Sequence, residues 1–158
     1  MGKKREDWLT KSIEGKSSIR DGILNAQTEK EMSHLKNKRV LLVDDSEEFT
    51  LMVTALLKKC GILAVKSLHD ETRTMEEIIK FNPDIVMIDI MMPSVGGFTV
   101  GKVVQELTRS LVPIIYVTAN KSYRQDLALQ ESERTEWLFK PVSLLTLQEK
   151  MTKLLGRK

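Results

Sequence analysis

The sequence predicts an α/β fold in which helices cover both faces of a five-stranded parallel sheet. Between residues 38 and 156, strand-like and helix-like segments alternate five times, and this alternation is typical of parallel sheets. In the segment DIVMID at 84–89, the four residues at 85–88 are all apolar, which indicates a strand buried on both sides. With right-handed crossovers, the flavodoxin-like doubly wound order 2-1-3-4-5 is the natural arrangement for five strands.

Each predicted element has its own local signals. Ser46 is a candidate N-cap for the first helix, two acidic residues follow it, and Gly61 can end that helix. The second strand is poorer in apolar residues than the others, so we expect it at an edge of the sheet. Strands are predicted at 38–44, 63–68, 84–89, 113–119 and 136–140, and helices at 46–61, 71–81, 97–109, 122–132 and 143–156.

Residues 1–37 differ from the rest of the chain. They are polar, contain Gly15 and Gly22, and place apolar residues sparsely, so a helix there would be marginal by itself. We expect an N-terminal arm over residues 1–37, partly helical or disordered, followed by one domain over residues 38–158. An arm that docks on a partner or on a second copy of the chain is the alternative.

Composition excludes several classes of protein. The formal net charge is +3 over 158 residues, and neither the arm nor the domain is strongly basic, so a nucleic-acid footprint is not expected. The single cysteine, Cys60, excludes an internal disulfide and a CxxC metal site. No apolar stretch is long enough to span a membrane and the N-terminus has no signal-peptide core. We therefore expect a cytoplasmic protein without membrane contact.

Polar side chains stand where four of the five predicted strands end. The first strand ends at Asp44 and Asp45, the third at Asp89, the fourth at Thr118 and the fifth at Lys140. Individually each has a plain explanation, such as capping, a β-branched strand residue or a solvated charge. Because ligands of such sheets bind outside the carboxyl ends of the strands, the combination predicts a site at this edge.

The chemistry of this set points to phosphoryl transfer. Three neighbouring carboxylates raise one another's pKa unless a cation lies between them, and Mg²⁺ is commonly held by carboxylates and phosphate oxygens. With the metal in place, Asp89 can act as a nucleophile toward phosphorus. Lys140 and the Thr118 hydroxyl would neutralise or bind the remaining phosphoryl oxygens.

The sequence closely resembles the receiver domain of two-component response regulators, over about residues 38–156. The motifs that carry the resemblance are VDD at 43–45, DIMMPSVGG from Asp89, VTA at 117–119 and KP at 140–141. The resemblance implies that Asp89 accepts a phosphoryl group from a histidine kinase or a phosphotransfer protein. It implies Mg²⁺ held by Asp45 and Asp89, by Asp44 through water, and by the backbone carbonyl of Met91, and a cis bond between Lys140 and Pro141.

The resemblance also implies a switch. In the family the residue at Thr118 moves toward the phosphoryl group, and an aromatic residue three positions before the lysine turns inward. Here that aromatic position is Trp137, where tyrosine or phenylalanine is usual, so the inward state is expected to be incomplete; static packing is the alternative. Charged residues at 132–136 replace the usual small pair, which predicts an unusual partner. Met91 is apolar and should shield the acyl phosphate from water, which predicts a long-lived phosphoryl group.

We therefore expect a single-domain response regulator that signals through phosphorylation-dependent binding to a downstream target protein. A receiver-like scaffold that works without phosphorylation, or a homodimer formed through the arm, is the alternative. No turnover of a separate substrate is expected beyond self-phosphorylation and autodephosphorylation. A transcription factor is disfavoured because no DNA-binding domain follows the last helix. A dehalogenase-type phosphatase is disfavoured because Met91 stands where it needs a second aspartate.

Overall fold

The computed structural model describes residue 30 and residues 33–156. Five strands form one sheet, each five residues long: β1 (Arg39–Val43), β2 (Ala64–Leu68), β3 (Ile85–Asp89), β4 (Ile114–Thr118) and β5 (Thr135–Phe139). The α-helices that follow β1 are α2 (Glu47–Lys59), α3 (Thr74–Phe81), α4 (Gly97–Thr108), α5 (Arg124–Gln130) and α6 (Leu144–Leu155), with 3₁₀ turns η1 (Glu71–Arg73) and η2 (Lys121–Tyr123).

The sheet is parallel and has the predicted order β2-β1-β3-β4-β5. β2 lies at an edge, as its composition predicts, and its residues are only partly buried up to Leu68. β3 lies in the centre, and all five of its residues are buried. Because all strands run the same way, their carboxyl ends meet at one edge of the sheet.

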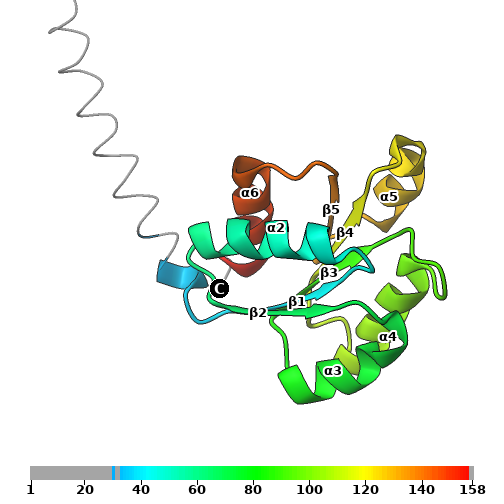
Figure 1. The fold of residues 1–158 in the computed structure, drawn as a ribbon, viewed down its shortest axis with the longest axis horizontal. Helices are drawn as coiled ribbons and strands as arrows, with labels where there is room; N and C mark the ends of the chain where they lie inside the picture. The colour runs from blue at the N-terminus through cyan, green and yellow to red at the C-terminus, as the bar shows by residue number, and fades with distance from the viewer. Residues whose placement is uncertain (1–29, 31–32, 157–158) are drawn as a thin grey trace, which may run out of the picture.

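Helices cover both faces of the sheet (Figure 1), with α2 and α6 on one side and α3 and α4 on the other. The alternating side chains of each strand divide between two apolar cores. Val53, Leu57, Leu147 and Met151 bring α2 and α6 against the first core. Ile78, Val100, Val104 and Leu127 bring α3, α4 and α5 against the second.

The helix boundaries follow from their caps. The Ser46 side chain accepts a hydrogen bond from the Phe49 N–H, which confirms Ser46 as N-cap, and Gly61 follows the helix with a φ of 91°. The predicted helices at 71–81 and 122–132 each begin with a 3₁₀ turn, because the side chains of Asp70 and Asn120 accept bonds from backbone N–H groups two residues later.

Most of the expected N-terminal arm lies outside the described residues. Of its last residues, Leu35 is only 1% exposed and packs in the core between the sheet and helices α2 and α6. Cys60 is buried, and His34 and His69 are exposed. Among the described residues, no helix combines the length and apolar character that crossing a bilayer requires.

Candidate functional site

Three carboxylates meet at the carboxyl edge of the sheet. Asp44, Asp45 and Asp89 each offer an oxygen, and these oxygens lie within 4.8 Å of one another. β1 and β3 are neighbours in the sheet, with Val43 opposite Ile88, so Asp44 and Asp89, the next residue along each chain segment, come together. Asp44 and Asp89 are buried, whereas Asp45 is exposed and faces solvent. The predicted cluster therefore forms, with one side open to a ligand.

Three hydrogen bonds hold Asp44 in place. Its backbone N–H donates to the Leu68 carbonyl of β2, at 3.1 Å. One carboxylate oxygen, Oδ1, accepts a 2.8 Å bond from the Ser46 N–H, and Oδ2 accepts a 3.0 Å bond from Lys140 Nζ. Its side chain is therefore fixed before any ligand arrives.

Asp89 ends β3 beside this pair. Its Oδ1 accepts a 3.1 Å bond from the Met91 N–H, and its Oδ2 lies 3.5 Å from Lys140 Nζ. Burial raises the pKa of Asp89 and the charge of Asp44 raises it further, against the opposing effects of Lys140 and the Met91 N–H. The negative charge of the Asp89 carboxylate is thus incompletely compensated, and a cation beside it would relieve that cost.

Lys140 lies between the two buried carboxylates. Its side chain is 21% exposed, and its Nζ sits 4.0 Å from the centre of the Phe49 ring, within the range of a cation–π contact. Its backbone N–H donates to the Thr118 carbonyl at 2.9 Å, and the peptide bond to Pro141 is cis, as predicted. The ammonium is therefore directed at the acidic cluster by both backbone and ring.

Thr118 and Trp137 lie on neighbouring strands. Thr118 is fully buried at the end of β4, one residue beyond Val117, which pairs with Asp89. Its hydroxyl oxygen accepts a 3.1 Å bond from the Asn120 N–H. Trp137 is partly buried opposite Tyr116 and makes an edge-to-face contact with Phe139, with ring centres 5.1 Å apart.

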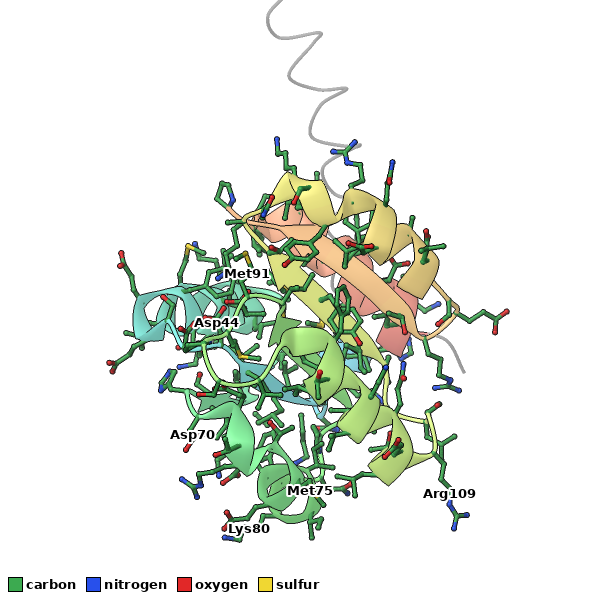
Figure 2. The ribbon with its side chains drawn as sticks, turned by 90° about the vertical axis from the view of Figure 1, so that its right-hand side faces the viewer. Asp44, Asp70, Met75, Lys80, Met91 and Arg109 are labelled. Carbon is green, nitrogen blue, oxygen red and sulfur yellow. The ribbon has the colours of Figure 1, made fainter. Side chains whose placement is uncertain are left out.

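Met91 begins the loop that follows Asp89. Met91 is 56% exposed, so its side chain is not packed in either core. Figure 2 shows Met91 and Asp44 on the same side of the molecule, above the segment that carries Asp70. Met91, the apolar residue expected to shield the acyl phosphate, is thus two residues after Asp89 in the chain.

The donor set fits a hard divalent cation. Carboxylate oxygens in a group of three, with one open side, suit the oxygen-rich and partly hydrated coordination of Mg²⁺. The raised pKa of Asp89, caused by burial and by Asp44, is also relieved by such an ion. The residues present are thus compatible with Mg²⁺ at this edge.

Two residues beside the site were not predicted from the sequence. Phe49 contacts Lys140 only through tertiary packing, and no sequence pattern marks it. Glu71 is a buried carboxylate that accepts bonds from the loop after Asp89. It follows β2 by three residues, so the strand-end rule that selected the other acids, applied to the second strand as well, would have drawn attention to it.

Comparison with known proteins identifies the relatives of this chain. The sequence profile of the response regulator receiver domain matches residues 40–152. The transcriptional regulatory protein TrcR of Mycobacterium tuberculosis is 32% identical over 119 residues, which are 75% of this chain and 46% of TrcR.

Two solved structures are similar over nearly their whole length. The chemotaxis protein CheY4 of Vibrio cholerae is 27% identical with a TM-score of 0.65, over 75% of this chain and 98% of that one. TrrA of Thermotoga maritima, solved in complex with Mg²⁺ and BeF, is 28% identical with a TM-score of 0.66, over 75% of this chain and 99% of that one. The chain spans about half, or less, of the length of the curated relatives that it matches.

Proposed function

The chain belongs to the family of response regulator receiver domains. We propose that it accepts a phosphoryl group on Asp89 and that the phosphorylated protein is the signalling form. The observation that carries this proposal is the position of Lys140. Its Nζ lies 3.0 Å from Asp44 and 3.5 Å from Asp89, beside three carboxylates whose oxygens lie within 4.8 Å of one another. A merely structural ion pair would not require the third, exposed carboxylate.

In the proposed reaction, a carboxylate oxygen of Asp89 forms a bond to phosphorus and the bond from phosphorus to the donor breaks. The leaving group is the imidazole of a phosphohistidine, or acetate from acetyl phosphate, and it keeps the electron pair of the broken bond. Asp44, Asp45, Asp89 and the Met91 carbonyl would hold Mg²⁺, which supplies neutralisation of the phosphoryl oxygens when bound. Lys140 would bind a phosphoryl oxygen with its ammonium, and the Thr118 hydroxyl would donate a hydrogen bond to another.

The switch to a signalling form would run through Thr118 and Trp137. The Thr118 hydroxyl accepts a bond from Asn120 in the structure, and rotation toward a phosphoryl group would break it. Trp137 lies opposite Tyr116, a neighbour of Thr118 along β4. A cavity of about 430 Å³ between β5 and α6 is lined by Trp137 and Lys150, and it offers room for a change in the ring's position.

For partners, we propose a histidine kinase or a phosphotransfer protein as donor and a protein as downstream target. Relatives include proteins named DNA-binding response regulators, but this chain matches them over only part of their length. No contact with nucleic acid is proposed for the residues described. We also propose that the domain begins no later than Leu35, since that side chain is buried in its core.

Incubation with acetyl phosphate, with and without Mg²⁺, followed by intact mass measurement tests the proposal. We expect a gain of one phosphoryl group that requires Mg²⁺ and is absent in Asp89→Asn. No gain in the wild type would favour the alternative, a scaffold that acts without phosphorylation. Removal of residues 1–29, which spares Leu35, followed by measurement of mass in solution, then tests whether the arm forms a homodimer.

A further inference from the structure

Glu71 is a buried carboxylate outside the proposed reaction site. It is 6% exposed, although it lies at the start of a surface turn. One of its oxygens, Oε1, accepts two backbone hydrogen bonds, from the Ser94 N–H at 3.0 Å and from the Val95 N–H at 2.9 Å. These donors lie 23 and 24 residues further along the chain, so the contact joins two separate loops at the edge of the sheet.

The turn that carries Glu71 is itself held in place. The Asp70 side chain accepts a bond from the Thr72 N–H at 3.0 Å, and the Glu71 carbonyl accepts a 2.6 Å bond from the Thr74 hydroxyl. Figure 2 labels Asp70 and Met75, which bracket this turn, below Asp44. These bonds hold the backbone on both sides of Glu71, and its carboxylate is itself restrained by burial and by the two bonds from the loop.

The loop that Glu71 holds is the one that follows Asp89. It is fixed at its start, where the Met91 N–H donates to Asp89 Oδ1, and at its end, where the Gly97 N–H donates to the Ile90 carbonyl at 3.0 Å. Ser94 and Val95 lie in between. Their bonds to Glu71 therefore fix the middle of the loop, and with it the path of the backbone from Met91 onward.

The strand end that leads into this turn also contacts Asp44. The Leu68 carbonyl at the end of β2 accepts the Asp44 N–H, and Glu71 follows three residues later. Burial alone raises the pKa of Glu71, but the hydrogen bonds from its own N–H and from those of Val95 and Ser94 outweigh it, so the pKa lies below its usual value. The carboxylate is thus ionised at neutral pH and makes charge-assisted bonds to the loop.

We propose that Glu71 is a positioning residue that sets the affinity of the site for Mg²⁺. It holds the loop of residues 91–96, and so presents the backbone carbonyl of Met91 to the cation without touching the cation itself. The inference rests on the proposed function, since it assumes that Mg²⁺ binds among Asp44, Asp45 and Asp89. Outer groups that orient metal ligands commonly change metal affinity by about 10- to 100-fold when they are removed.

A matched pair of variants isolates the acceptor. Glu71→Gln keeps the shape and one acceptor oxygen, whereas Glu71→Met keeps the approximate volume and has none. In the metal-free protein, we expect Glu71→Met to speed amide hydrogen exchange at Ser94 and Val95. By calorimetric titration we expect it to weaken Mg²⁺ binding by about tenfold, with Glu71→Gln close to the wild type in both measurements.

Glu77→Met is the control for general damage to this region. Glu77 is also buried and pairs with Lys66 and Arg73, so its loss should lower stability without changing Mg²⁺ affinity. Unchanged exchange at Ser94 and Val95 in Glu71→Met, or faster exchange with unchanged Mg²⁺ affinity, would overturn the inference. A separate control tests the metal site itself: the wild type should bind Mg²⁺ more tightly than Asp45→Asn. Equal affinities would show that the proposed metal site is wrong, and the effect of Glu71 on Mg²⁺ affinity would then be wrong as well.

Discussion

The ammonium of Lys140 lies 3.0 Å from a carboxylate oxygen of Asp44, a residue 96 positions earlier in the chain. Both side chains are largely buried, and the contact joins the ends of β1 and β5, which are not neighbours in the sheet. The contact therefore joins strands that are separated in the sheet by β3 and β4.

Replacing Lys140 with methionine should slow phosphorylation from acetyl phosphate. The variant keeps the apolar stem beside Phe49 but removes the charge that would stabilise a phosphoryl oxygen. Loss of one such preorganised group commonly costs about 10²- to 10³-fold in rate. The initial rate of mass gain measures it, and Lys121→Met, at an exposed position in η2, is the control. Equal rates for Lys140→Met and the wild type would remove Lys140 from the mechanism.

Replacing Asp89 with asparagine should stabilise the metal-free protein. The pKa of Asp89 is raised by burial and by Asp44, so the stability it contributes is present at low pH and is lost as the pH rises through the folded-state value. At neutral pH the ionised side chain therefore lowers the free energy of unfolding. Urea unfolding in the presence of EDTA should show a more stable variant, with the difference shrinking on acidification.

Added Mg²⁺ should reduce or reverse the stability advantage of Asp89→Asn over the wild type. The ion binds the folded wild type and raises its free energy of unfolding by mass action. The same unfolding experiment, repeated over a range of Mg²⁺ concentrations, measures this. A variant that is less stable than the wild type in EDTA at neutral pH would show that the charge of Asp89 is already well compensated.

Gly97 is required by the close approach of α4 to the end of β3. A Cβ at this position would lie 2.3 Å from the Asp89 carbonyl oxygen and 2.6 Å from the Ile90 Cα. Both are backbone atoms that cannot move aside easily, so Gly97→Ala should lower the free energy of unfolding by about 1–3 kcal/mol. Gly96→Ala is the matched control, because nothing lies within 4 Å of its Cβ. Similar unfolding midpoints for the two variants would contradict the packing described.

The phosphoryl group on Asp89 should be long-lived. Met91 is apolar, exposed and two residues from Asp89, so it can keep water from the acyl phosphate. We expect a half-life of minutes or more, and a shorter one in Met91→Asn, whose amide can hold water by hydrogen bonding. Decay of the phosphorylated mass after removal of the donor measures it, with the exposed Met75→Asn of α3 as control. Decay of the wild type within seconds would refute the shielding role.

Much of this fold could be predicted from the sequence because its signals are local. The apolar runs of β1, β3 and β4 mark buried strands, and Ser46 marks the start of α2. The strand-end rule then predicted the convergence of Asp44, Asp45 and Asp89, which the structure confirms. That rule works because it follows from the direction of parallel strands and does not need side-chain packing.

Other features could not be predicted in this way. The contact of Phe49 with Lys140 joins α2 to the end of β5 and depends on how the helix packs. Leu35 is flanked in the sequence by the polar residues His34 and Lys36, so no local pattern marks it as buried. Its burial depends on how it packs against α2 and α6. The two bonds from the β3–α4 loop to Glu71 depend on the exact path of that loop, which no local pattern specifies.

The central claim is that Asp89 is the residue that accepts the phosphoryl group. Reaction with acetyl phosphate and Mg²⁺, followed by borohydride reduction and peptide mapping, tests it most directly, because reduction of an aspartyl phosphate leaves homoserine at the modified position. We predict homoserine at position 89 alone, with no conversion when Mg²⁺ is omitted. Homoserine at position 44 or 45, or a phosphorylated protein without homoserine at 89, would contradict the account.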